Sequence, residues 1–406
     1  MAARHSHDLI LQSRPFAKTT VSRLVLLALV LVASVATCRS DPALPQPISP
    51  RCDYSDGEWT YSKTNPRYKG CPYIREIFDC RDNGRGDRRW EQQKWSPRYC
   101  AIKYFNAARF QKLMANKTIA FIGDSLMTNM WESFSCMLWG YNIKMLPVQQ
   151  RLGPEAKFTG FHLPKSNTTI LYRFSSYLTK ASRSQGRDPL HGGRHGYTVD
   201  VDIVDPVLSA AAAKVDAVVL TSGMWWQANV PGRKVSNIYK MQGVDTLYSD
   251  LNAYKKSLYT VRELLLKYKS SLLSYYISFS PQHKFEPRFA TLPGTCGYSL
   301  PLNQSAAKAF LSNQAASAAT YTAAQRQVFT SPTPVRLLDI TAISAARPDG
   351  HVGQYGVKGG LPVGQVAERG DCRHWCLPGV PDSWVDLMHT AWENEPALVE
   401  PANRRA

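Results

Sequence analysis

The amino-acid sequence predicts an α/β fold in which helices cover both faces of a mostly parallel sheet. Short, uninterrupted apolar runs occupy residues 118–122, 217–221, 272–279 and 335–340. Segments with helical patterning accompany them over residues 126–139, about 246–270 and the alanine-rich 305–328. Continuously apolar strands that alternate with helices are typical of a sheet buried on both faces. The 406 residues, 44% of them hydrophobic, suffice for one large domain with an N-terminal extension or for two modest ones.

The N-terminal segment is basic over residues 1–23 and uncharged and mostly apolar over residues 24–38. Because the cationic side of such a run stays in the cytosol, we expect a cytosolic tail at 1–23 and a signal anchor at 24–38. A cleaved signal peptide is the alternative, with Ser34-Val35-Ala36 as its cleavage site. Residues 39–51 are proline-rich and predict a short stem. Both interpretations place the body of the protein in a lumen.

The nine cysteines support a location outside the cytosol. Eight of them follow residue 38, and an even number in such a setting predicts up to four disulfides. A zinc site at Cys372 and Cys376 is the weaker alternative, because no second close pair accompanies them. We expect a cysteine-rich subregion over 52–117, a main domain over 118–390 and a C-terminal tail over 391–406. Sequons for N-glycosylation begin at Asn116, Asn167 and Asn303.

The formal charge of +18 restricts the classes of partner. Nucleic acid explains it poorly, because a luminal protein rarely meets nucleic acid and the chain contains no recognisable nucleic-acid module. An anionic ligand or an acidic polysaccharide fits the charge, and so does a solvated basic surface. The histidines and carboxylates do not cluster as metal ligands would, so we expect no metal and no bound cofactor.

The first chemical motif is Gly123-Asp124-Ser125, which follows the strand predicted over 118–122 and opens the helix predicted after it. A serine in that position lies at the carboxyl edge of a parallel sheet, where ligands of open α/β folds bind. The helix N-terminus also offers free N–H groups that can hold an oxyanion. The simpler alternative is that Asp124 or Ser125 only caps the helix.

The second motif is Asp371-Cys372-Arg373-His374-Trp375-Cys376, near the end of the chain. On a helical turn, Asp371 and His374 would share a face, and the carboxylate could orient the imidazole. Together with Ser125 they are the parts of a nucleophilic acyl-transfer site. The alternative is a surface loop with unrelated polar residues.

A third feature follows the strand predicted over 217–221. Gly223 can turn a backbone N–H toward a reacting carbonyl, or it simply makes a tight turn. Trp225 and Trp226 either belong to the core or stack on sugar rings of a substrate. Residues 141–210 show no clear periodicity, and the part at 180–197, rich in Arg, Gly and His, predicts an exposed loop.

These motifs resemble the trichome-birefringence-like family of plant and algal polysaccharide O-acetyltransferases. The N-terminal likeness runs from Cys52 through Trp59, Trp90 and Trp95 to Phe121-Ile122-Gly123-Asp124-Ser125-Leu126. The C-terminal likeness includes Arg347-Pro348-Asp349-x-His351 and the run from Asp371 to Trp384. The resemblance spans about residues 52–386 and is dense at both ends.

The resemblance implies a GDSL/SGNH-hydrolase-like fold with a disulfide-stapled N-terminal subregion, anchored in the Golgi membrane as a single-pass type II protein with a luminal catalytic domain. It implies Ser125 as nucleophile, His374 as base and Asp371 as its orienter. It also implies the pairs Cys52–Cys100, Cys71–Cys136, Cys80–Cys376 and Cys296–Cys372. Members of the family transfer acetyl groups to hydroxyls of wall polysaccharides.

Three positions depart from the family pattern. The family's Asn and His before the tandem tryptophans are replaced by Thr221 and Met224, and an Arg is replaced by Ile277. Since that Asn helps to hold the oxyanion, Thr221 is expected to contribute a hydroxyl there, beside Gly223. The loss of the Arg bears on the identity of the substrate more than on the reaction.

The sequence therefore supports an O-acetyltransferase that uses an acyl-serine intermediate, with a polysaccharide acceptor and acetyl-CoA as a candidate donor. A polysaccharide acetylesterase would use the same groups with water as the acceptor. A wall-glycan binding protein without catalysis is the alternative from another class, and the departures at 221, 224 and 277 are its only support.

Overall fold

The computed structural model of the protein describes residues 53–184, 194–227, 235–283, 296, 300–313, 318–330, 333–362, 365 and 369–399. The predicted cytosolic tail, signal anchor and stem, residues 1–51, lie outside the described residues. Among the helices that are described, none combines the length and the apolar character needed to cross a bilayer.

The centre of the fold is a seven-stranded sheet with the strand order β13-β12-β9-β3-β6-β5-β4. The four predicted strands are present as β3 (Thr118–Gly123), β9 (Ala217–Thr221), β12 (Leu273–Ile277) and β13 (Val335–Leu338). These four strands and β6 (Thr168–Phe174) run parallel to one another. Strand β5 (Lys157–Leu163) pairs antiparallel with β6, and β4 (Leu146–Arg151) pairs antiparallel with β5. The prediction of a mainly parallel α/β sheet is confirmed.

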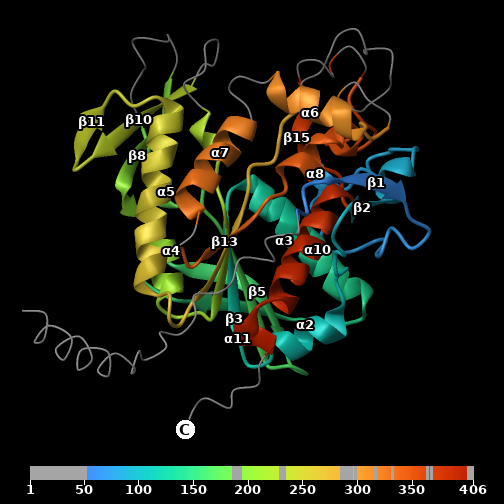
Figure 1. Ribbon diagram of the computed structural model, residues 1–406, viewed down its shortest axis with the longest axis horizontal. Helices are drawn as coiled ribbons and strands as arrows, with labels where there is room; N and C mark the ends of the chain where they lie inside the picture. The colour runs from blue at the N-terminus through green and yellow to red at the C-terminus, as the bar shows by residue number, and fades with distance from the viewer. Residues whose placement is uncertain are drawn as a thin grey trace, which may run out of the picture. The chain divides into compact units, whose positions relative to one another are not determined.

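Helices cover both faces of this sheet, as Figure 1 shows. On one face lie α2 (Ala107–Leu113), α3 (Ser125–Gly140) and α10 (Val380–Glu393), and on the other α4 (Pro206–Ala212), α5 (Asp250–Lys267) and α7 (Ala318–Phe329). Every residue of β9 is buried, as expected for a central strand between two helical layers. The hydrophobic core extends from this sheet into both layers.

The long helix predicted over 305–328 is wrong in its extent. The structure has α6 (Gln304–Ser312) and α7 as separate helices, and the residues between them include some outside the described part. The alanine-rich composition predicts helix throughout, but it carries no signal for an interruption. The helix predicted at about 246–270 begins later, at α5, because Val244–Thr246 form the short strand β11.

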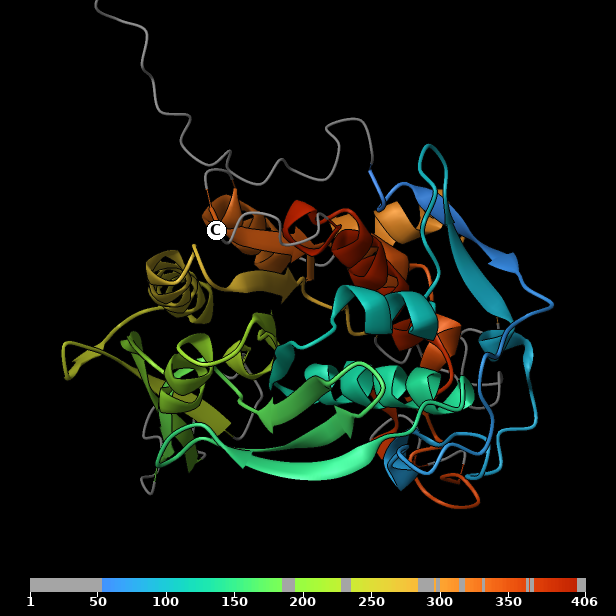
Figure 2. The same cartoon turned by 90° about the horizontal axis from the view of Figure 1, so that it is seen from below.

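The region from 141 to 210 contains five described strands that the sequence did not predict. Besides β4 to β6 it forms β7 (Thr179–Arg183) and β8 (Arg194–Val204), which join β10 (Val235–Met241) and β11 in a second, four-stranded sheet. The prediction of a loop over 180–197 is therefore wrong at both ends, and residues 185–193 lie outside the described part. Figure 2 shows strands β4 to β6 extending along α3.

The described part of the N-terminal subregion contains, besides α2, the antiparallel pair of β1 (Gly57–Tyr61) and β2 (Gln93–Pro97). Disulfides tie it to the rest of the chain at Cys71–Cys136 and Cys80–Cys376, and a third bond joins Cys296 to Cys372. Three of the four expected pairs are thus present. Cys52 lies outside the described residues, so its bond to Cys100 stays a prediction.

The short elements at the C-terminal end complete the fold. Helix α8 (Thr341–Ala345) follows β13, the hairpin of β14 (His351–Gly353) and β15 (Asp371–Trp375) precedes α10, and α11 (Pro396–Val399) ends the described chain. Since β15 packs against the start of α3, residues from the two ends of the globular body meet at one edge of the sheet.

Candidate active site

Ser125 is the first residue of α3, directly after β3. Asp124 is the N-cap of that helix, and its side chain accepts a hydrogen bond from the Leu126 N–H at 3.0 Å. Asp124 therefore caps the helix, and Ser125, which is half-buried, is its first residue. The serine lies at the carboxyl edge of the parallel strands, where α/β folds place their ligands.

The structure brings Ser125, His374 and Asp371 together in one hydrogen-bonded chain. The distance from His374 Nε2 to Ser125 Oγ is 2.7 Å, and the distance from His374 Nδ1 to Asp371 Oδ2 is also 2.7 Å. The His374 and Asp371 side chains keep 18% and 21% of their surface exposed, so solvent and ligands can reach them. This is the arrangement in which an imidazole takes the proton of a serine while a carboxylate orients the ring.

Asp371 and His374 lie on strand β15 rather than on the helical turn predicted for them. The Asp371 side chain nevertheless turns toward His374, because Asp371 Oδ1 accepts hydrogen bonds from the backbone N–H groups of Arg373 at 3.0 Å and His374 at 2.9 Å. Burial by itself would raise the pKa of Asp371, but the bond from the His374 ring, its charge and these two N–H groups hold it well below the ordinary value. Asp371 is therefore an anion at any physiological pH.

Asn129, which the sequence did not single out, and the motif residue His351 hold β15 beside α3, the helix that Ser125 begins. Asn129 on α3 accepts the Trp375 N–H at 2.8 Å and donates to the Trp375 carbonyl at 3.1 Å. His351, from the Arg347-Pro348-Asp349-x-His351 motif, contacts the His374 carbonyl through Nδ1 at 2.9 Å and stacks on Trp375. Asn129 follows Ser125 by four residues, and this spacing, which places both on one face of a helix, could have indicated from the sequence that Asn129 lies near the site.

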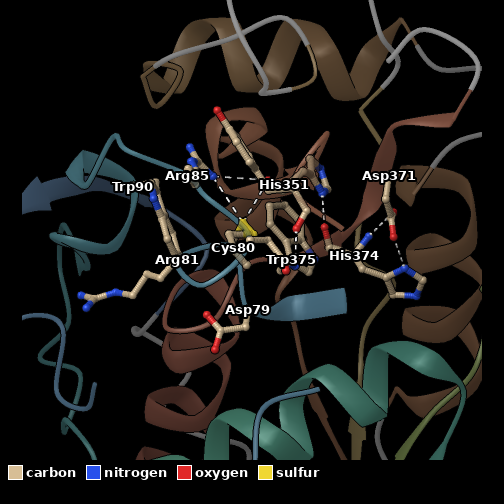
Figure 3. The surroundings of a disulfide bond; sticks show 12 residues. Asp79, Cys80, Arg81, Arg85, Trp90, His351, Asp371, His374 and Trp375 are labelled. Atoms are coloured by element: carbon tan, nitrogen blue, oxygen red, sulfur yellow. Dashed lines mark hydrogen bonds and ion pairs between the residues drawn. A yellow bond between two sulfur atoms is a disulfide. The ribbon is translucent and has the colours of Figure 1, made fainter. Parts of the chain in front are cut away.

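The Cys80–Cys376 disulfide supports the same strand from the N-terminal subregion (Figure 3). Arg85 lies beside it, donates to the Asp349 carbonyl at 2.7 Å and sits over the Trp90 ring at 4.7 Å. Burial lowers the pKa of Arg85 to about 10, so the guanidinium stays charged at neutral pH. A covalent bond and the contacts of a buried cation therefore anchor the chain directly after the strand that carries His374.

Gly223 follows β9, next to the Gly123-Asp124-Ser125 turn, hereafter the nucleophile turn after the role expected of Ser125. A Cβ added there would come within 2.6 Å of Phe279 Cε2, so only glycine fits. The neighbouring Met224 N–H donates to Asp124 Oδ2 at 3.3 Å, which ties the Gly223 turn to the nucleophile turn. Burial raises the pKa of Asp124 to about 6, although two backbone N–H groups favour its anion.

The expected contribution of the Thr221 hydroxyl to an oxyanion site does not fit the structure. Thr221 is buried, and its hydroxyl donates to the Ile277 carbonyl on β12 at 3.2 Å. A hydroxyl has one proton to donate, so this one is already used. Ile277 and Met224, the other two departures, are also buried.

The two tryptophans after Gly223 have opposite surroundings. Trp226 is 0% exposed, donates to Ser222 Oγ at 2.9 Å and stacks on Tyr239, so its expected contact with substrate is wrong. Trp225 is 36% exposed and meets the edges of Phe174 and Tyr197. Only Trp225 can present an aromatic surface to a ligand.

The sequon asparagines are exposed in the structure. Asn167 donates to Asn116 Oδ1 at 3.0 Å, and Asn303 caps α6 by accepting the Ala306 N–H at 2.8 Å. Their glycosylation stays a prediction.

A mainly parallel α/β sheet with a Gly-Asp-Ser turn at its carboxyl edge and an Asp-x-x-His pair from the chain's end defines a GDSL/SGNH-like protein. The chain belongs to the PC-esterase family, a GDSL/SGNH-like acyl-esterase family found in Pmr5 and Cas1p, whose family model matches residues 102–391. Residues 50–101 match the PMR5 N-terminal domain. The expected family and fold are confirmed.

Plant proteins of this family are similar to the chain over most of its length. Xyloglucan O-acetyltransferase 1 of Arabidopsis thaliana is 30% identical over 346 residues, which cover 84% of this chain and 80% of that protein. Xyloglucan O-acetyltransferase 1 of Populus trichocarpa is 29% identical over 359 residues, covering 83% and 80%. Protein trichome birefringence-like 43 of Arabidopsis thaliana is 29% identical over 382 residues, covering 91% and 96%.

Proposed function

We propose that this protein is a polysaccharide O-acetyltransferase whose catalytic residues are Ser125, His374 and Asp371. The observation that carries the proposal is the 2.7 Å contact between His374 Nε2 and Ser125 Oγ, with Asp371 on the other ring nitrogen. Relatives named xyloglucan O-acetyltransferase support the transfer of acetyl groups to a polysaccharide.

The reaction has two halves with one acyl-serine intermediate. In the first, Ser125 Oγ attacks the acetyl carbonyl of the donor while His374 takes the serine proton. The tetrahedral intermediate collapses, the donor's leaving group departs with that proton, and the acetyl group stays on Ser125. In the second, a sugar hydroxyl gives its proton to His374 and attacks the acyl-serine, and His374 returns the proton to Ser125.

The backbone N–H groups of Ser125 and Gly223 are the proposed donors to the oxyanion. Both residues lie at the carboxyl ends of adjacent parallel strands, and Asp124 ties their turns together. Oxyanion donors of this kind contribute about 10²–10³ to kcat in acyl transfer. Acetyl-CoA is the proposed donor, and the proposed location is the Golgi lumen, with residues 24–38 as a type II anchor.

The decisive experiment incubates the purified protein with a labelled acetyl donor and a set of neutral and acidic glycans. Stable label on a glycan is the expected result, and Ser125→Ala should lower the rate at least about 10³-fold because the nucleophile is lost. Ser271→Ala is the matched control, since Ser271 precedes β12 at the opposite edge of the sheet.

The esterase alternative is favoured by the description of the family as acyl-esterases. Release of labelled acetate with no labelled glycan would support it against the transferase. Full transfer by the Ser125→Ala variant would contradict both.

A further inference from the structure

Two buried phenols converge on the carbonyl oxygen of Ser222, the residue that precedes Gly223. Tyr254 on α5 donates to this oxygen at 2.8 Å, and Tyr276 on β12 donates to it at 3.2 Å. Both tyrosines are fully buried. One donor is enough to satisfy a buried carbonyl, so the second phenol exceeds what burial requires. The acyl-transfer mechanism above uses neither side chain.

The hydrogen bonds of Gln325 on α7 determine the direction in which the Tyr254 hydroxyl donates. Gln325 Oε1 accepts the Phe279 N–H at 3.0 Å, so the amide nitrogen Nε2 faces the Tyr254 hydroxyl, at 2.6 Å. Because an amide NH2 group only donates, the Tyr254 oxygen accepts this bond. The single proton of Tyr254 is therefore left for the Ser222 carbonyl, which is nearer than the Tyr276 hydroxyl at 3.2 Å.

Ser222 is held through its side chain as well. Its Oγ donates to the Ser176 carbonyl at 3.2 Å and accepts the indole N–H of Trp226 at 2.9 Å. Burial raises the pKa of Tyr254 and of Tyr276 well above the ordinary value of a phenol, so both hydroxyls stay neutral donors at physiological pH. The orientation of the Ser222 carbonyl is thus fixed by contacts that do not titrate near neutral pH.

The peptide group between Ser222 and Gly223 carries this orientation into the candidate active site. The peptide is trans, and in a trans peptide the C=O of one residue and the N–H of the next point in opposite directions. Tyr254 and Gln325 come from the layer of α5 and α7, on the face of the sheet opposite to α3 (Figure 1). The Gly223 N–H is therefore turned toward the face on which Ser125 begins α3.

The Gly223 N–H is available to a ligand. Among the residues that the structure describes, none accepts a hydrogen bond from it. The following N–H, of Met224, donates to Asp124 in the nucleophile turn at 3.3 Å, so this stretch of backbone faces Ser125. Donors on the carbonyl of a peptide group also polarise it, which makes its N–H a stronger donor.

We propose that Tyr254 and Tyr276 are positioning residues that aim and strengthen the oxyanion donor of the acyl transfer, the Gly223 N–H. As negative charge develops on the acetyl oxygen, this N–H donates to it, and the two phenols stabilise the electron density that shifts to the Ser222 carbonyl. The tyrosines act through the backbone and bind no substrate themselves. The proposal rests on the acyl-serine mechanism of the proposed function and adds to it the side chains behind the donor.

The test measures the acylation of Ser125 by 4-nitrophenyl acetate, because the initial burst of nitrophenolate reports that step alone. We expect Tyr254→Phe and Tyr276→Phe each to lower the acylation rate constant about three- to tenfold, the value of one neutral hydrogen bond. The double variant should lose about 10²-fold, as when an oxyanion donor is removed. The ester concentration that half-saturates the burst rate should not change, since the donor acts on the tetrahedral state.

Tyr275→Phe is the matched control. Tyr275 is also buried on β12, but it alternates with Tyr276, and its ring meets Trp392 of α10 on the opposite face of the sheet. Removal of its hydroxyl deletes the same group from the same strand and should leave the acylation rate constant unchanged. Urea unfolding of all four variants records their stability.

The infrared C=O stretch of a ¹³C-labelled acetyl group on Ser125, held by rapid acidification, separates aiming of the donor from support of the fold. A hydrogen bond to this carbonyl lowers its frequency, so the double variant should absorb at a higher frequency than the wild-type protein. An unchanged acylation rate in the double variant, or a slower rate with an unmoved frequency, would overturn the proposal. Acylation without any labelled glycan would contradict the transferase function and leave this inference intact. Absence of acylation of Ser125 in the wild-type protein would overturn both.

Discussion

At the scale of single residues, Asp124 serves both halves of the candidate site. Its Oδ1 accepts the Leu126 N–H at the start of the nucleophile helix, and its Oδ2 accepts the Met224 N–H beside Gly223. The carboxyl is 1% exposed, and burial raises its pKa to about 6. Its anion, which is the better acceptor, is therefore lost as the pH falls through about 6.

The first prediction concerns Asp124→Asn, an isosteric change that keeps one acceptor oxygen. A group with a pKa raised to about 6 is ionised above that pH and protonated below it, so the Asp124 contribution to activity is present at pH 8 and fades as the pH falls through about 6. We expect the variant to lose about tenfold in kcat/KM at pH 8, the value of one charged hydrogen bond. The wild-type-to-variant ratio should shrink toward one between pH 8 and pH 5.

The measurement is kcat/KM for both proteins across that range, with unfolding temperatures recorded at each pH as the control. A ratio that does not change with pH would show that Asp124 acts only as a helix cap.

The same residues show what the sequence could predict about the site. Ser125, Asp371 and His374 occur in short motifs with chemical meaning, and the structure places them within hydrogen-bond distance of one another. The second bond of Asp124, the bridge from Asn129 to Trp375 and the burial of Trp226 depend on contacts between distant segments. Single-sequence patterns contain no information on such contacts, so these features came only from the structure.

At the scale of elements, the site depends on how closely β9 and β12 end beside each other. The two strands pair in parallel, and Phe279 after β12 lies against Gly223 after β9. A side chain at position 223 would overlap the Phe279 ring and push the backbone of this turn out of place. Glycine therefore allows the Gly223 backbone to lie beside the nucleophile turn. The position of the proposed oxyanion donor is thus set by the packing of strand ends.

The second prediction is that Gly223→Ala displaces this turn and lowers kcat at least about 10²-fold, the cost of losing one oxyanion donor. Overpacking of this kind also costs about 1–3 kcal/mol of folding free energy. The double variant Gly223→Ala/Phe279→Leu should recover part of the activity, because the smaller side chain makes room for the new methyl group. Phe279→Leu alone is the control.

The measurements are kcat with a labelled acetyl donor and the free energy of unfolding in urea. Undiminished activity of the Gly223→Ala protein would exclude a backbone donor at this position.

Strand type explains which elements the sequence revealed. Strands β3, β9 and β12 are buried on both faces, so their apolar runs are continuous and easy to recognise. Strand β4 has no fully buried residue and reads as a polar segment. The helical turn predicted for Asp371 and His374 is wrong because a spacing of three residues is not specific to a helix. In β15 the two side chains also meet, since the Asp371 carboxylate accepts the backbone N–H of His374.

At the scale of the whole molecule, the N-terminal subregion is part of the framework of the active site. Arg67 forms a two-pronged ion pair with Asp386 on α10, at 2.6 and 3.0 Å. Trp59 donates to the Ile343 carbonyl at 2.9 Å, and the Cys80–Cys376 bond joins residues 296 positions apart, two residues from His374. The two family models meet between residues 101 and 102, but the segments on either side of that boundary pack together as parts of one folded unit.

The last prediction follows from that sharing. A chain that starts at residue 102 leaves Asp386 buried without Arg67, which costs about 3–5 kcal/mol, and it lacks the Cys71–Cys136 and Cys80–Cys376 disulfides, each worth about 2–5 kcal/mol. Together these losses approach the 5–15 kcal/mol by which domains are stable, so we expect no cooperative unfolding transition and no acetyl transfer. A chain that starts at residue 52 keeps these contacts and should unfold cooperatively and remain active. Circular dichroism melts and the labelled-donor assay on both shortened chains check this, and an active, cooperatively folded 102–406 chain would show that the subregion is an appendage rather than a support for His374.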